Sequence, residues 1–161
     1  MANSVIVPLD GSKLAEQALP LGISLAQQID SRLQLVQVIP NADQTFNYIS
    51  TPDGNMMPID IIETFRANAQ RYLKQKKTQL LEAGITVETS IIEGDVAPAI
   101  ADFANKEEAA YLVMSTHGRS GLSRWMLGSV ADQVLHLSEC PLLIIRPKET
   151  SDALLASSLI P

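Results

Sequence analysis

Five short apolar segments alternate with longer amphipathic segments along this chain, and this alternation restricts the fold more than any other feature. A run of about four to eight apolar residues suits a buried strand, whereas apolar residues at steps of three and four suit a helix with one buried face. Strands and helices in alternation are typical of a parallel sheet with helices on both faces. We expect strands at Ser4 to Leu9, Leu33 to Val38, Thr86 to Ile92, Tyr111 to Ser115 and Leu142 to Arg146, the first and last being apolar enough to be covered on both faces.

The amphipathic segments predict four helices. Pro20 should kink the first of them, because proline lacks a backbone donor. Gly84 suits a left-handed cap at the end of the second, and Asp95 is of a type that caps the start of the third. The helices are expected at Leu14 to Ile29, Asp60 to Ala83, Val96 to Asn105, and from Gly128-Ser129 onward.

The length of 161 residues predicts one α/β domain over residues 1–147 and a C-terminal tail over residues 148–161. Five strands wound in this way favour a single doubly wound parallel sheet with the order 3-2-1-4-5. Between the second strand and the second helix lies Asn41 to Pro58, a long connection that suits either a lid over a site or a mobile loop. We favour the mobile loop.

Composition argues against several classes of partner. Twelve basic and 18 acidic residues give a net charge of −6, so the chain has no general attraction for nucleic acid or anionic membranes. The apolar run Ala109 to Met114 is far shorter than the roughly 18 residues that indicate a membrane span. No secretory leader is evident and Cys140 is the single cysteine, so we expect a protein of the reducing cytoplasm.

The stretch from Met114 to Val130 runs from a buried strand through a glycine-bearing loop into a helix start. The first amides of a helix lack intrahelical partners and carry partial positive charge, so such a place holds phosphate well. In an open parallel sheet, ligands bind beyond the carboxyl ends of the strands, where the strand order reverses. The loop Asp10-Gly11-Ser12 should therefore flank the same crevice.

These segments together resemble the nucleotide-binding branch of the universal stress protein family, over the chain up to about Pro147. That branch has the pattern Gly-x2-Gly-x9-Gly-Ser/Thr, which Gly118 and Gly128-Ser129 match, whereas Ser115 stands at the first glycine. A serine there either crowds the nucleotide or donates a hydrogen bond to it, and we interpret it as tolerated. The resemblance rests on Val5 to Ser12, Glu93 to Asp95, Met114 to Gly121, Leu127 to Ala131 and Cys140 to Ile145.

The resemblance implies an ATP site, with Mg²⁺ or Mn²⁺ held through the phosphates. Pro8 and Val38 would line the adenine pocket, and Asp10 would meet the ribose or the metal. The remaining residues are expected along the nucleotide (Met114, Ser115, His117, Gly118), around the phosphates (Gly128, Ser129, Val130), and as added positive charge (Arg119, Arg124).

Plainer interpretations exist for several of these residues. Asp10-Gly11-Ser12 also suits a simple turn with a helix cap. Arg119 and Arg124 are equally well read as solvated loop charges. His117 has no serine and aspartate arranged around it in the sequence, so we interpret it as structuring the loop rather than as a general base. No metal site built from side chains is expected.

We therefore expect an ATP-binding protein in which nucleotide occupancy changes conformation or partner choice. No activated nucleophile or arranged base is evident, so we expect no efficient enzyme, although slow ATP hydrolysis is compatible with these residues. The last strand should lie at a sheet edge and join a homodimer through Leu142 to Ile145. Two alternatives are a dimeric interaction protein with an empty crevice and an enzyme that hydrolyses ATP or adenylates.

Overall fold

The computed structural model describes residues 4–41, 47–50, 56–59, 61–116 and 128–146. Its centre is a five-stranded parallel sheet with the order β5-β2-β1-β6-β7, which confirms the predicted order 3-2-1-4-5. The strands span β1 (Ser4–Pro8), β2 (Arg32–Ile39), β5 (Val87–Glu93), β6 (Tyr111–Ser115) and β7 (Leu142–Ile145).

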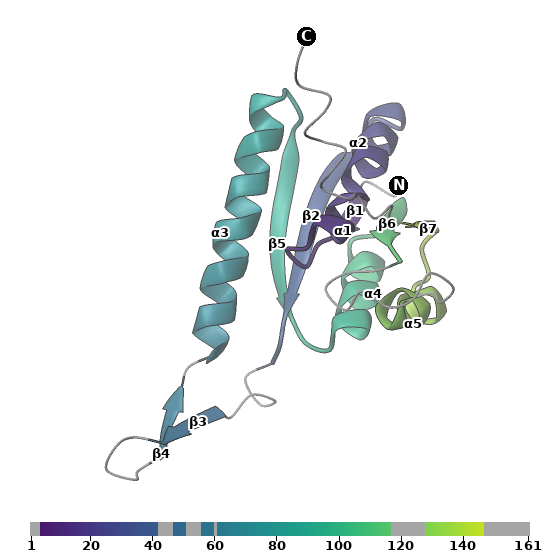
Figure 1. Ribbon diagram of the computed structural model, residues 1–161. Coiled ribbons are helices and arrows are strands. Elements are labelled where there is room, and N and C mark those ends of the chain that lie inside the picture. Colours follow the sequence, from purple (N-terminus) through teal and green to yellow (C-terminus); the bar gives the residue numbers. More distant parts are fainter. Residues whose placement is uncertain (1–3, 42–46, 51–55, 60, 117–127, 147–161) are drawn as a thin grey trace, which may run out of the picture.

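Helices cover both faces of the sheet, as Figure 1 shows. Successive side chains of a strand point to opposite faces, so Val5 and Val7 join one core and Ile6 joins the other. All three side chains are fully buried. The first face carries α1 (Lys13–Glu16), α2 (Leu19–Gln28) and α3 (Ile61–Glu82), and the second carries α4 (Val96–Lys106) and α5 (Ser129–Leu137).

The expected kink at Pro20 is a break between two helices. α1 ends at Glu16, and α2 starts at Leu19 with the proline in its first turn. A proline ring clashes with the carbonyl four residues earlier, which here belongs to Glu16, and it offers no donor to that carbonyl. The proline therefore ends one helix and begins the next.

The long helix α3 ends as predicted at a left-handed glycine. Gly84 has φ +77°, its amide bonds the Leu81 carbonyl at 2.9 Å, and the Ile85 amide bonds the Leu80 carbonyl at 2.8 Å. These two bonds satisfy carbonyls that the end of the helix would leave without donors. Although α3 has 22 residues, none of the described helices is long and apolar enough to cross a membrane.

The connection from Asn41 to Pro58, which was expected to be a lid or a mobile loop, contains two short strands that were not predicted from the sequence. β3 (Asn47–Ser50) and β4 (Met56–Ile59) pair in antiparallel fashion, with Tyr48 opposite Pro58. Figure 1 shows this hairpin beyond the end of the main sheet, just before α3. Pro52 and Gly54 lie between the two strands in the sequence, whereas Pro58 lies within β4. The predicted mobility concerns residues 42–46 and 51–55, which lie outside the described residues.

Two smaller expectations are also wrong. Asp95 holds the N-cap position of α4, but its side chain makes no capping hydrogen bond. The last strand, β7, is apolar yet only half-buried along its length, because it pairs with β6 on one side and forms an edge of the described sheet. An edge strand lacks the neighbour that would complete its cover.

Candidate functional site

β1 and β6 end side by side, at the carboxyl end of the sheet. The two strands are parallel neighbours, with Val5 paired to Tyr111 and Ile6 to Leu112. From β1 the chain winds outward through β2 to β5, and then returns to add β6 and β7 on the other side of β1. The strand order thus reverses between β1 and β6, and this is where open parallel sheets bind ligands.

The loop after β1 is a tight turn that runs straight into α1. Gly11 has φ +84°, a conformation that favours glycine. Asp10 Oδ1 accepts a hydrogen bond from the Ser12 amide at 2.9 Å, and Ser12 Oγ accepts one from the Ala15 amide at 3.1 Å. The turn and helix cap of the plainer interpretation are therefore both present. They also hold the Asp10 carboxylate in a defined position at the end of β1, beside the switch point.

β6 ends beside this loop, and its last residues are buried. Met114 and Ser115 are each 6% exposed, and the Thr116 amide donates to the Ile145 carbonyl at 2.8 Å. Pro8, at the end of β1, is buried, and the half-buried Val38 packs against the same core as Met114. Four of the residues expected around adenine or along the nucleotide (Pro8, Val38, Met114 and Ser115) thus lie at the ends of neighbouring strands.

The start of α5 offers backbone donors. Gly128 is its N-cap residue, with φ −58° and ψ 145°, and a glycine has no side chain with which to cap the helix. The helix begins at Ser129, which is exposed, and the next residue, Val130, is half-buried. Amides in the first turn of a helix point outward along its axis and attract anions. This nine-residue helix can therefore bind an acceptor-rich group such as phosphate.

Part of the predicted site cannot be placed. His117, Gly118, Arg119 and Arg124 lie outside the described residues, so the contribution of the glycine loop stays a prediction. The structure brings the Asp10 loop and the end of β6 together at one switch point, and α5 follows β6 before β7.

Another charged group at the carboxyl end of the sheet, an ion pair around Arg66, was given no role from the sequence. Arg66 of α3 pairs with Glu93 at the end of β5 and lies 3.7 Å from Glu63. The hydrogen bond with Glu93 raises the pKa of Arg66, so this guanidinium stays charged. The next residue, Gly94, has φ +143° and donates its amide to the Ile39 carbonyl at 3.0 Å. The Glu93-Gly-Asp95 motif was the available signal, and its glycine shapes the turn between β5 and α4.

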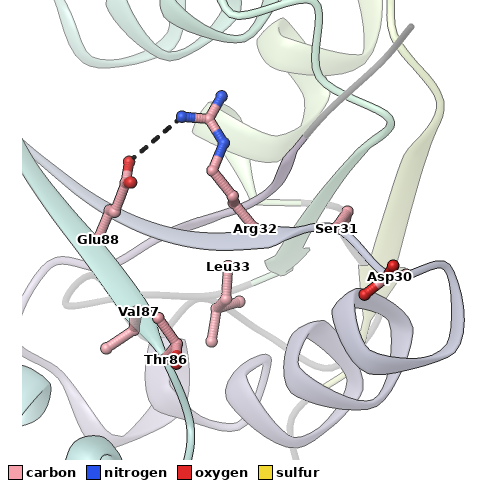
Figure 2. Close-up of a pocket in the computed structure, with 7 residues that line it drawn as sticks. All are labelled: Asp30, Ser31, Arg32, Leu33, Thr86, Val87 and Glu88. Carbon is pink, nitrogen blue, oxygen red and sulfur yellow. Dashed lines mark ion pairs between the residues drawn. The ribbon is translucent and has the colours of Figure 1, made fainter.

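A hollow of about 460 Å³ lies at the other end of the sheet, where β2 and β5 begin. Figure 2 shows Arg32 and Glu88 joined across it above the apolar side chains of Leu33 and Val87. Their ion pair is 3.6 Å long and both side chains are 52% exposed, so it contributes little to stability. The single guanidinium is already paired and Asp30 adds negative charge. The hollow is therefore poorly suited to a polyanion. Among the described residues, no group of three metal-ligating side chains is present.

The strand order, the two helical layers and the reversal between β1 and β6 define a doubly wound α/β domain with a switch point between these two strands. Residues 1–146 match the family model described as the universal stress protein family. The chain therefore belongs to the universal stress protein family.

Two relatives are similar in sequence over most of their length. A universal stress protein of Methanocaldococcus jannaschii is 31% identical over 148 residues, which cover 91% of this chain and 84% of the relative. Universal stress protein YxiE of Bacillus subtilis is 31% identical over 150 residues, which cover 91% of this chain and 100% of the relative. The domain described above thus corresponds to nearly the whole of these relatives.

Solved structures share the fold. UspA from Lactobacillus plantarum superposes with a TM-score of 0.72 at 22% identity, covering 89% of this chain and 97% of that one. A universal stress protein in complex with cAMP gives 0.64 at 20% identity, covering 91% and 98%. The protein from Archaeoglobus fulgidus in complex with dAMP gives 0.63 at 22% identity, covering 91% and 98%. These likenesses establish the fold, and two of the structures hold an adenine nucleotide.

Proposed function

We propose that this protein binds ATP in the crevice between the loops after β1 and β6, and that occupancy of the crevice changes its conformation or its choice of partner. One observation carries the proposal: the Asp10 loop and the chain that continues to α5 leave neighbouring strands at the switch point, and α5 begins at a glycine, which has no side chain to cap it. A carboxylate on one side and backbone donors on the other suit the two ends of a nucleotide. Members of the family with the same fold hold cAMP or dAMP, which supports adenine as the base.

The proposed roles follow the chemistry of each residue. Pro8 and Val38 flank the adenine, and Asp10 meets the ribose or a metal ion. The first amides of α5, together with the Ser129 hydroxyl, donate to phosphate oxygens, which only accept. Mg²⁺ or Mn²⁺ would be held through the phosphates and would neutralise part of their charge. His117, Gly118, Arg119 and Arg124 complete the proposed phosphate side.

The position of Ser115 supports its interpretation as tolerated. Strand alternation puts its side chain on the same face of the sheet as Val113, which belongs to the core under α2. Met114 points to the opposite face, where α5 lies. The serine side chain is thus directed away from the helix that is proposed to hold the phosphates, and it is nearly buried. A nucleotide bound at the start of α5 should therefore not clash with the Ser115 side chain.

We propose a binding protein rather than an efficient enzyme. The described side chains at the crevice supply one carboxylate, hydroxyl groups and backbone donors, which position a nucleotide but do not activate a nucleophile. The ring of His136 lies 2.7 Å from the Asp132 carbonyl on its own helix. That contact is local to α5. Slow hydrolysis of bound ATP remains compatible with this set of groups.

We further propose a homodimer joined along β7. In the described part of the chain, Leu142–Ile145 pairs with β6 alone, and all four residues are half-buried. Leu135 and Leu137 on the preceding helix α5 are 50% and 47% exposed. An apolar sheet edge invites pairing with another strand, and a second copy would cover it. Sedimentation analysis of the wild type and of an Ile144→Asp variant tests this: the variant should be monomeric, and a monomeric wild type contradicts the dimer.

Calorimetric titration with ATP, ADP, AMP and cyclic AMP tests the nucleotide site. The wild type should bind ATP, Gly128→Val should lose binding because a branched side chain enters the phosphate approach, and Ser115→Gly should bind nearly as the wild type does. Thermal denaturation of each variant controls for folding.

Two outcomes separate the alternatives. A folded wild type that binds none of the four nucleotides supports the interaction protein with an empty crevice. Steady ATP turnover that Asp10→Asn or Ser129→Ala abolishes supports the enzyme.

A further inference from the structure

The short helix α1 is attached to α3 through a single carboxylate. Glu16 is the last residue of α1, and its Oε1 accepts a hydrogen bond from the Tyr72 hydroxyl at 2.9 Å. Its Oε2 lies 2.8 Å from Lys76 Nζ. The Lys76 and Glu16 side chains are only 18% and 24% exposed, so solvent screens this ion pair less than one on the open surface. One helix thus engages both oxygens of Glu16.

The three side chains form a compact group, the Glu16–Tyr72–Lys76 cluster. Lys76 Nζ lies 5.8 Å from the centre of the Tyr72 ring, within the range of a cation–π contact. The ring packs against the core under α2 and α3. Burial raises the pKa of the Tyr72 hydroxyl, as do its hydrogen bond to Glu16 and the negative charges of Glu16 and Asp10. The hydroxyl therefore stays protonated as a donor to Glu16.

α1 needs such an attachment because it is too short to be stable alone. It has only four residues. Forming the first turn of a helix is entropically unfavourable, and a helix this short gains too few further hydrogen bonds to offset that cost. Pro20 prevents it from continuing into α2. The Ser12 cap and the buried Ala15 hold its start, and the Glu16–Tyr72–Lys76 cluster holds its end. The Asp10–Ser12 loop enters directly into this turn.

We propose that Tyr72 and Lys76, acting through Glu16, position the Asp10–Ser12 loop for the ribose of a bound adenine nucleotide. This inference rests on the proposed nucleotide function and adds to it two positioning residues on α3, a helix outside the crevice. Neither residue touches the ligand. Their effect is to fix a carboxylate beforehand, so that less conformational freedom is lost on binding.

Titration with ATP and with 2′,3′-dideoxy-ATP tests the proposal. Tyr72→Phe removes only the hydroxyl, and it should weaken ATP binding about three- to tenfold, as should Lys76→Met. Because the effect passes through Asp10 to the ribose, Tyr72→Phe should change little in the Asp10→Asn background or with the dideoxy nucleotide. The matched controls are Tyr111→Phe on β6 and Lys74→Met on the exposed face of α3, and both should bind as the wild type does. An equal loss in both backgrounds, or with both nucleotides, indicates a general structural role and overturns the proposal.

A measurement without nucleotide separates this proposal from the proposed function. Amide hydrogen exchange over Gly11 to Ala15 should be faster in Tyr72→Phe and Lys76→Met than in the wild type and the two controls. Unchanged exchange in both variants overturns the positioning role. If the two variants show faster exchange than the wild type but the wild type binds neither nucleotide, the proposed function is refuted and the attachment of α1 is still established.

Discussion

Gly22 allows α2 to approach β1 closely, and its replacement by alanine tests how tightly this layer is packed. The residue is buried on the face of α2 that meets the sheet. A Cβ at this position would lie 2.5 Å from Val7 Cγ2, and 3.7 Å from Leu33 Cδ1. The first distance is far below a normal carbon–carbon contact of about 3.5–4 Å. The methyl group it strikes belongs to a fully buried valine on a central strand.

Two opposing contributions set the size of the effect. Overpacking a close-packed core by one methyl group costs about 1–3 kcal/mol. Replacing glycine by alanine inside a helix returns about 0.5–1 kcal/mol. Val7 is β-branched and stiff at χ1, so it cannot turn aside easily. We therefore expect Gly22→Ala to lower the free energy of unfolding by about 1–2 kcal/mol, or the melting temperature by about 3–6 °C.

Urea denaturation of four chains measures this contact: the wild type, Gly22→Ala, Val7→Ala and the double variant. Val7→Ala removes the methyl group that the new Cβ strikes, so the double variant should be at least about 1 kcal/mol more stable than the sum of the single losses predicts. Gly84→Ala is a useful comparison, because nothing lies within 4 Å of its Cβ and its φ of +77° alone should cost stability. A Gly22→Ala variant as stable as the wild type, or additive losses in the cycle, would refute the close packing.

Three further predictions concern single groups. Ser12→Ala removes the cap that bonds the Ala15 amide at 3.1 Å, and urea denaturation should show a loss of about 1 kcal/mol, whereas an unchanged midpoint contradicts the cap. Gln34 is 6% exposed and its Oε1 has no partner among the described residues, so Gln34→Met should raise the free energy of unfolding by about 0.5–1 kcal/mol despite the loss of the bond to Ser90, and a lower value contradicts this. The pKa of Tyr72 is raised in the folded state, whereas in the unfolded chain it is about 10. The unfolded state therefore loses this proton first as the pH rises, and between pH 9 and 10.5 the wild type should lose more stability than Tyr72→Phe, as measured by urea denaturation at both values.

Much of the fold follows from local patterns. All five main strands lie within two residues of their predicted bounds, because short apolar runs and amphipathic stretches leave each segment few ways to bury its apolar side chains. The Gly84 cap and the end of α1 ahead of Pro20 are equally local, since each depends on the backbone chemistry of one residue. The hairpin β3–β4 was missed because its strands have only four residues each and the segment contains prolines and a glycine, which are common in loops.

The candidate site could be predicted only where its parts are contiguous in sequence. The Asp10 turn and the helix start at Gly128 each have a local signature, and the structure contains both. The break between α1 and α2 has such a signature too, but the short helix that it leaves needs support from elsewhere. No local pattern indicates what that support is.

By itself, the sequence determined the five strands of the main sheet, the helices between them and the Gly84 cap, because these depend on residues within one or two turns of chain. Tertiary structure alone decided that Glu16 meets Tyr72, 56 positions away, and that Gly22 rests against Val7. Such contacts arise from how the layers pack, and packing depends on the shape of every element at once. The turn at Asp10 is therefore local in origin, whereas the attachment of α1, which follows that turn, depends on a helix far along the chain.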